Sequence, residues 1–282
     1  MFTIEDRNRL RDQLLAEAEL DDAVVGIAFT GSHAVGADDR WSDTDIVLAV
    51  RGDITPVLNR WTRWLHEELG AQHHCDLPAG TRTIRVFLLP SWLEIDMTFA
   101  PEAEFGPRGP QWRTVFGQAQ PLEPFPDPDP DTLAGLLWHH ALHARISLER
   151  GRLWQAEHWI SAMRDHVITL ACLRLGHPAT YAKGAHRLPA ELTTPLETTL
   201  VRSLTEPELH RALGATLTAV TDELQRSDAT LATRLRPMFG ELSEGTEGPA
   251  GAVTPGGRRF SCSRPRASTA WVPRSGQESQ ST

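Results

Sequence analysis

The stretch VVGIAFTGSHAVGADDRWSDTDIVLAV, residues 24 to 50, decides the fold of the chain. It opens with a short apolar run over 24–30, rich in β-branched residues, and closes with a second apolar run over 46–50; both predict buried strands. Between them lie Gly31-Ser32, where a helix can begin, and a polar loop that ends in Asp43-Thr44-Asp45. Two carboxylates at i and i+2 on a strand point to one face and repel each other. A divalent cation such as Mg²⁺, which prefers oxygen ligands, is therefore their expected partner.

These residues resemble the Gly-Ser…Gly…Ser-Asp-x-Asp pattern of the nucleotidyltransferase superfamily, to which the polymerase β-like and antibiotic nucleotidyltransferases belong. The pattern is formed here by Gly31-Ser32, Gly36 and Ser42-Asp43-Thr44-Asp45. Small bacterial members often carry Arg directly after Gly-Ser and again two residues later, where this chain has His33 and Val35. This departure from the pattern affects the expected contacts to the triphosphate and does not affect the expected metal site.

A third carboxylate is expected on a later strand. The residues WLEIDMTF, 92–99, alternate apolar and polar side chains, which is typical of a strand covered on one face. This period places Glu94 and Asp96 on the same face. The superfamily carries its third metal-binding carboxylate on such a strand, and Asp96 matches that place, with Glu94 as the near alternative.

The resemblance implies a metal-dependent transfer of a nucleoside monophosphate. Two Mg²⁺ ions, about 3.5–4 Å apart in such sites, clamp the attacking and leaving oxygens. Asp43 and Asp45 would share these ions, and Asp96 would hold the ion on the acceptor side. Gly31 would let the backbone approach a phosphate, and Ser32 would donate its hydroxyl and amide groups to it. The competing interpretation of the acidic pair is a solvated turn between two strands.

Composition divides the chain into regions. Residues 1–120 predict an α+β nucleotidyltransferase domain with a small mixed sheet, and residues 131–240 predict an antiparallel helical bundle that binds the acceptor. The Pro-rich stretch 121–130 is expected to link them, and the Pro and Gly content of 100–130 argues against helix or central strand there. Residues 241–282 lack apolar periodicity and predict a disordered tail.

The helical region offers further site residues. Related antibiotic nucleotidyltransferases place a catalytic carboxylate on a helix of this region, which implies Glu157; the alternative is a structural pair of Glu157 with Ser161 or Arg164 at helical spacing. Lys183 is predicted to reach the nucleotide phosphates, with Tyr181 beside it for stacking, and a solvated loop is the alternative for both. His139 and His143 have a spacing that can bind zinc, but no third ligand is evident from the sequence.

Charge and cysteine content restrict the functions to be considered. The net charge of −9 argues against general nucleic-acid binding. Three distant cysteines, no apolar signal segment and no run long enough to span a bilayer predict a cytoplasmic protein that does not engage membranes.

The overall plan resembles the aminoglycoside and lincosamide nucleotidyltransferases. It implies ATP as the nucleoside triphosphate, a hydroxyl of a small molecule such as an aminoglycoside-like antibiotic as acceptor, and antibiotic resistance as a role; a homodimer that shares sites is an arrangement known among such enzymes. Two other functions stay open. One is antitoxin-like adenylylation of a protein or RNA, and the other is a nucleotide-binding module without catalysis.

Overall fold

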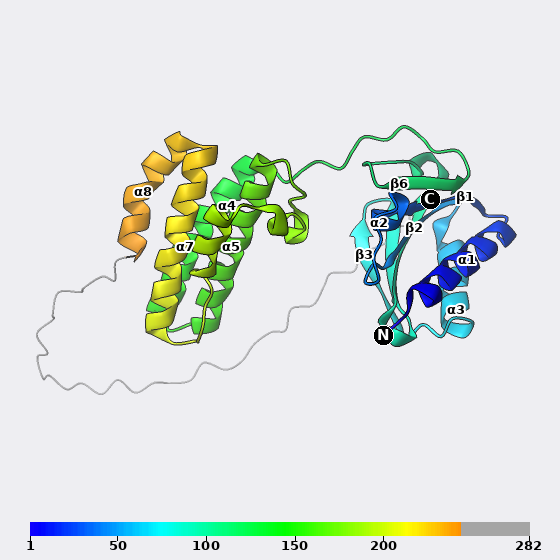
Figure 1. Ribbon diagram of the computed structural model, residues 1–282, viewed down its shortest axis with the longest axis horizontal. Helices are drawn as coiled ribbons and strands as arrows, with labels where there is room; N and C mark the ends of the chain where they lie inside the picture. Colours follow the sequence, from blue (N-terminus) through cyan, green and yellow to red (C-terminus); the bar gives the residue numbers. More distant parts are fainter. Residues whose placement is uncertain (244–282) are drawn as a thin grey trace, which may run out of the picture. The chain divides into compact units, whose positions relative to one another are not determined.

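The computed structural model describes residues 1–243, which form two compact units: the first spans Met1–Asp129, and the second begins at Pro130 (Figure 1). The first unit combines a mixed sheet with helices, and the second is helical, so the fold class is α+β, as predicted. No helix in the described part of the chain is both long and apolar enough to cross a membrane.

The first unit is built on a six-stranded sheet with the order β3-β4-β5-β2-β1-β6. Its strands are β1 (Val24–Thr30), β2 (Thr44–Val50), β3 (His73–Ala79), β4 (Arg82–Leu88), β5 (Glu94–Pro101) and β6 (Trp112–Phe116). The central strands β2 and β5 run parallel, and every other pair of neighbours is antiparallel. The motif strand β2 therefore lies in the middle of the sheet.

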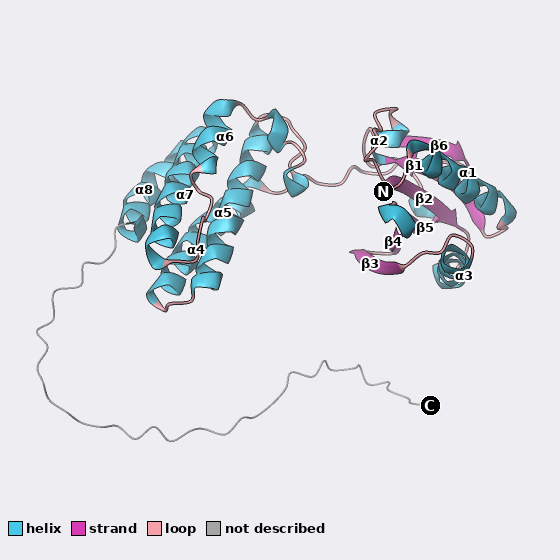
Figure 2. Ribbon diagram, turned by 60° about the horizontal axis from the view of Figure 1, so that its bottom comes forward, coloured by secondary structure: helices cyan, strands magenta, loops and turns pink. Residues whose placement is uncertain are grey.

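Two helices, α1 (Ile4–Leu20) and α3 (Ile54–Glu67), cover one face of this sheet (Figure 2). Thr3 caps α1 with a capping box to Asp6. The core between helices and sheet is apolar, and its most deeply buried members include Leu14, Ile27, Ile46, Leu48, Trp61, Leu65, Phe87, Ile95, Met97 and Phe99. Because alternate residues of β2 and β5 fill this core, the intervening residues Asp45, Val47, Asp96 and Thr98 point to the opposite face, called here the open face.

The second unit contains the helices α4 (Pro130–Glu149), α5 (Leu153–Arg174), α6 (Ala190–Glu197), α7 (Glu206–Ser227) and α8 (Ala229–Ser243). Two short 3₁₀ turns, Thr180–Ala182 and Ala185–Arg187, lie between α5 and α6. The unit has its own apolar core, centred on Leu137, Ala141, Ile160, Met163, Leu213 and Val220. Gly151 adopts a positive φ of 64° just after α4, where the helix ends.

The structure contains three features that the sequence analysis does not anticipate. Residues 100–130, whose Pro and Gly content argues against a central strand, include the edge strand β6, which pairs with β1 at a position that tolerates nearby Pro and Gly. The strand β3, which pairs with β4, has no predicted counterpart. Residues 241–243 belong to α8, whereas the rest of the predicted disordered tail lies outside the described residues.

Candidate active site

Parallel pairing of β2 with β5 sets two of the predicted carboxylates side by side. In the register of these strands, Asp45 is the direct partner of Asp96. Both point to the open face, since their neighbours Ile46 and Met97 are fully buried in the core. Two residues 51 positions apart in sequence thus meet because both strands begin at the same end of the sheet.

Asp43 completes a cluster of three carboxylates. It lies one residue before β2, and one carboxylate oxygen from each of Asp43, Asp45 and Asp96 falls within 4.8 Å of the others. All three side chains are half-buried. Glu94, the alternative third ligand, is exposed at the start of β5 and is not part of this cluster. Three converging carboxylates repel one another unless a cation lies between them, so this geometry suits a hard divalent ion.

Gly31 is required where β1 turns into the short helix α2 (Gly31–Ala34). Its φ of +63° is a left-handed conformation that favours glycine. A Cβ atom built on Gly31 would lie 2.0 Å from Oδ2 of Asp45, so a side chain here cannot coexist with the present position of that carboxylate. Gly31 was predicted to allow close approach of a phosphate; the structure shows that it already allows close approach of Asp45. Ser32 follows Gly31 as the second residue of α2.

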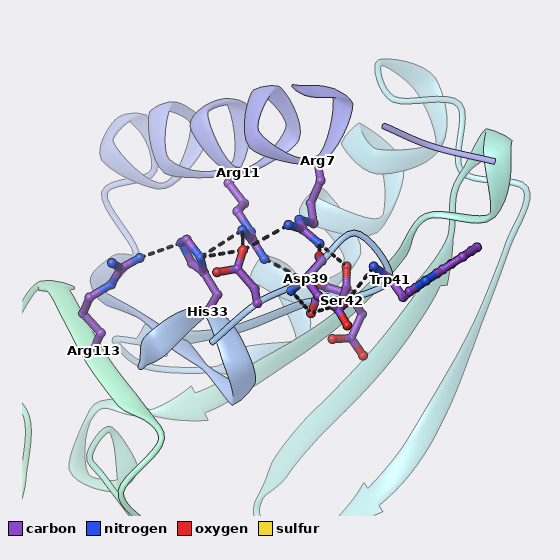
Figure 3. A network of polar contacts seen from close by, with 9 residues as sticks. Arg7, Arg11, His33, Asp39, Trp41, Ser42 and Arg113 are labelled. Atoms are coloured by element: carbon purple, nitrogen blue, oxygen red, sulfur yellow. Dashed lines mark hydrogen bonds and ion pairs between the residues drawn. The ribbon is translucent and has the colours of Figure 1, made fainter. Parts of the chain in front are cut away.

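Two buried arginines of α1 hold the loop that precedes Asp43 (Figure 3). Arg7 and Arg11 are only 2% and 3% exposed. Arg7 donates to the carbonyl oxygens of Asp39 and Ser42, the latter at 2.8 Å, and Arg11 donates to the carbonyl oxygen of Asp43 at 3.0 Å. The backbone on which the first carboxylate stands is therefore fixed by guanidinium groups that approach from the helix side.

Asp38 compensates part of this buried positive charge. It accepts hydrogen bonds from Arg7 at 3.0 Å and from Arg11 at 2.9 Å, and the bond from Arg11 is the main reason why the pKa of Asp38 is lowered to about 2. One carboxylate facing two guanidinium groups leaves a net positive charge behind the loop.

His33 belongs to the same network. Its Nδ1 lies 2.9 Å from Arg11, and its Nε2 lies 2.6 Å from Arg113 of β6, as Figure 3 shows. Burial, and next the charge of Arg11, lower the pKa of His33, so the ring is neutral at pH 7. His33, which stands where related proteins often have Arg, thus has both ring nitrogens facing arginines of the network.

Arg7 and Arg11 are residues that sequence reasoning missed. Their charge suggested a solvent-facing side of α1, although Arg7, Arg11, Leu14 and Ala18 recur at helical spacing along one stripe. All four are buried, whereas the apolar Leu20 at the end of the helix is 80% exposed. The sequence signal that could have identified the two arginines is their spacing, because they extend the stripe of buried residues on α1.

The remaining predicted site residues, Glu157 and Lys183, belong to the second unit. Glu157 is half-buried on α5 and accepts a hydrogen bond of 2.6 Å from Ser161, whose hydroxyl in turn accepts one of 2.8 Å from Arg164. This is the helical pairing that the sequence offered as the structural alternative. Lys183 is exposed after the first 3₁₀ turn, close in sequence to Tyr181, which is 90% exposed and has a strained φ of 54°.

The histidines of α4 do not form a zinc site. The rings of His139 and His143 lie 4.3 Å apart, but within residues 1–243 the only group of three or more residues with metal-ligand geometry is the aspartate cluster. His140 is buried against His166, their rings stacked with centroids 5.1 Å apart. Burial, followed by the nearby His166, lowers the pKa of His140 to about 4.

Comparison with known proteins gives little to add to this geometry. No family model and no curated protein matches the sequence. Among solved structures, an aminoglycoside 6-adenyltransferase from Bacillus subtilis is similar with a TM-score of 0.37 and 10% identity, over 82% of this chain and 96% of that chain. A likeness at this level identifies neither the substrate nor the reaction of this chain.

Proposed function

We propose that the chain is a nucleotidyltransferase, which transfers a nucleoside monophosphate from a nucleoside triphosphate, ATP in the first instance, to a hydroxyl group of a small molecule. The observation that carries the proposal is the cluster of Asp43, Asp45 and Asp96, whose carboxylate oxygens lie within 4.8 Å of one another beside Gly31. Together with the Gly-Ser motif before it, this cluster meets the main needs of phosphoryl chemistry, which are positioning and charge neutralisation.

The three carboxylates fit divalent metal, because they offer only oxygen ligands, which Mg²⁺ prefers. Mg²⁺, expected as two ions, would neutralise the charge that develops on the attacking and leaving oxygens. Asp43 and Asp45 would hold the metal next to the triphosphate, and Asp96 would hold it on the acceptor side. Arg11 fixes the backbone of Asp43 from behind, so this ligand is held in place before substrate arrives.

In the proposed reaction the acceptor oxygen forms a bond to the α-phosphorus, and the bond from that phosphorus to the oxygen bridging to the β-phosphate breaks. Pyrophosphate leaves, and the hydroxyl proton passes to a base. Gly31 and Ser32 would orient the phosphates with backbone amide and hydroxyl donors. We assign the catalytic unit to the α+β region. Glu157 is the proposed base and Lys183 a proposed phosphate ligand, both from the second unit.

A pyrophosphate-release assay tests this proposal. The full chain is incubated with Mg²⁺ and each nucleoside triphosphate against a panel of aminoglycosides, lincosamides and other hydroxyl compounds, with cell extract as a further source of acceptors. Asp45→Asn is expected to lower the rate at least about 1,000-fold, because a ligand of the metal is lost. Glu102→Gln, which alters an exposed carboxylate just beyond the far end of β5, is the control and should keep full activity.

The assay also separates the alternatives. Pyrophosphate release that needs a protein or RNA fraction of the extract would favour adenylylation of a macromolecule. Binding of ATP that is the same in the wild type and in Asp43→Ala/Asp45→Ala, with no pyrophosphate released under any condition, would reject catalysis and leave a binding module.

A further inference from the structure

A pocket of about 290 Å³ lies on the open face of the sheet in the first unit. Its lining includes Thr30 and Gly31 at the end of β1, together with Val47 and Thr98. Val47 is two residues beyond Asp45 on β2, and Thr98 is two residues beyond Asp96 on β5, so the pocket continues along the same face from the carboxylate cluster. A molecule bound at the carboxylates can therefore extend into it.

The far end of the pocket is positively charged. Arg82 of β4 and Arg108, from the loop before β6, both line it, and the ring of Phe125 lies 5.1 Å from one guanidinium group and 5.2 Å from the other. Glu104 is the acidic residue of the lining, and it forms an ion pair of 3.7 Å with Arg82. Two guanidinium groups and one carboxylate leave the pocket with a net charge of +1.

Arg108 has no carboxylate partner within residues 1–243; its Nη1 donates to the carbonyl oxygen of Glu123 at 3.0 Å. The Nε of Arg108 is buried and makes no hydrogen bond in the described part of the chain, whereas the buried Nε of Arg82 lies 3.7 Å from the carboxylate of Glu104. Burial, and next the charge of Arg108, lower the pKa of Arg82, which shows that the two cations oppose each other. Partly buried like charges are stabilised when an anion binds between them.

The position of the arginines indicates which of the two substrates they bind, the nucleoside triphosphate or the acceptor. Thr98 pairs with Ile84, and Arg82 lies two residues farther along β4, so the backbone of Arg82 stands four residues, about 13 Å, beyond the level of Asp96. Gly31 and Ser32 already supply the proposed donors for the triphosphate, at the near end. The far end of the pocket lies farther along β5, the strand that carries Asp96. Asp96 is the carboxylate proposed to hold the metal on the acceptor side.

We propose that this pocket binds the acceptor, and that the acceptor carries an anionic group, such as a phosphate or carboxylate, attached to a compact ring. The anion lies between Arg82 and Arg108, the ring packs against Val47, Ile84 and Phe125, and a hydroxyl reaches the carboxylate cluster. This inference rests on the proposed function and deepens it. It disfavours polycationic acceptors such as aminoglycosides, because these would meet a pocket of their own sign.

Isothermal titration of the full chain, without nucleoside triphosphate, tests the pocket directly. The probes are matched pairs, glucose 6-phosphate with glucose and phenyl phosphate with phenol, and an aminoglycoside. The phosphorylated member of each pair is expected to bind at least tenfold more tightly than its uncharged partner. Arg82→Met and Arg108→Met should each weaken its binding at least fivefold, and Arg108→Lys should lose less than Arg108→Met because it keeps the charge.

Arg85→Met is the matched control. Arg85 lies on the same strand as Arg82 but on the other face of the sheet, where it bonds to Asp76 and Thr62, so its loss should leave probe affinity unchanged. Thermal unfolding of each variant identifies any that fail to fold. Equal binding within the pairs, preference for the aminoglycoside, or an equal effect of Arg85→Met would overturn the inference.

The results that would refute the acceptor pocket differ from those that would refute the proposed function. Asp45→Asn should abolish pyrophosphate release and retain binding of the phosphorylated probes. Pyrophosphate release to an acceptor whose binding does not depend on Arg82 or Arg108 would refute the pocket and preserve the function. Probe binding that depends on Arg108, with no pyrophosphate release from any triphosphate, would refute the function and preserve the anion site. If Arg108→Met weakens ATP binding while no probe binds, the pocket belongs to the triphosphate and the inference fails.

Discussion

Groups of opposite charge lie on the two sides of the loop before β2. On the open face, Asp43 and Asp45 converge with Asp96, and on the helix face Arg7 and Arg11 reach the same backbone from behind. The carboxylates are half-buried and the arginines almost fully buried. The acidic cluster therefore depends on two buried arginines, which hold the backbone of the loop, as much as on the three carboxylates that would bind a metal.

Removal of Arg11 should have the largest effect on the stability of this arrangement. Arg11→Met deletes the donor to the carbonyl oxygen of Asp43 and leaves Asp38 with one guanidinium partner fewer. Breaking a buried ion pair by removing one partner costs about 3 kcal/mol of unfolding free energy. We also expect at least tenfold weaker binding of Mg²⁺ with nucleotide. Chemical denaturation and metal titration measure the two effects.

Arg7→Met is the matched variant. Arg7 is equally buried and also bonds to Asp38, but its carbonyl partners are Asp39 and Ser42. It should lose similar stability and less metal affinity than Arg11→Met. Equal losses of metal affinity in the two variants would show that the contact to Asp43 has no particular role.

A side chain at Gly31 should have the next largest effect. Gly31→Ala forces a residue with a Cβ atom into a φ of +63° and drives that atom into the carboxylate of Asp45. The backbone cost alone is about 2 kcal/mol, and the displaced carboxylate should lower pyrophosphate release about 100-fold. Gly36→Ala, at a similar φ of +68° but with open space around it, is the control for the backbone cost. Equal activity in both variants would contradict a role for close packing against Asp45.

The two units should respond differently to acid. The pKa of His140 is lowered to about 4, so this residue is neutral in the folded state and its unfolded form binds protons more readily. Its contribution to stability is present at neutral pH and is lost as the pH falls from 6.5 towards 4, by between about 1 and 2 kcal/mol at pH 5. Asp38, with its pKa lowered to about 2, contributes stability above pH 3.8 that is lost only as the pH falls towards 2.

Hydrogen exchange at pH 7.5 and pH 5 can follow the two units separately. We expect protection to fall in α4 and α5 at the lower pH while β2 and β5 keep theirs. His140→Gln should reduce the pH effect, and His158→Gln, at an exposed position of α5, should not. A loss of protection that begins in β2 would contradict this assignment.

The sequence predicted most of what positions the candidate site. The strands β1, β2 and β5 were found because each has a face of large apolar residues, and Asp96 was preferred to Glu94 on the strength of its place in the strand. The edge strands β3 and β6 were missed because they lie at the ends of the sheet and show no such face: Leu77 and Val115 are both more than 40% exposed. The arginine cluster was missed because charge was taken as a sign of solvent exposure. Arg82 and Arg108 could not be joined from sequence, since only the packing of the loop before β6 on the open face brings them to one pocket.

The most direct test of the central claim is metal binding at the three carboxylates. Electron paramagnetic resonance can follow Mn²⁺ bound to the full chain in the presence of an α,β-methylene analogue of ATP, for the wild type, Asp45→Asn, Asp96→Asn and the control Glu102→Gln. The account predicts that the wild type and the control bind Mn²⁺ alike and that each aspartate variant binds it at least tenfold more weakly. Equal Mn²⁺ affinity in all four proteins would contradict a metal site at Asp43, Asp45 and Asp96.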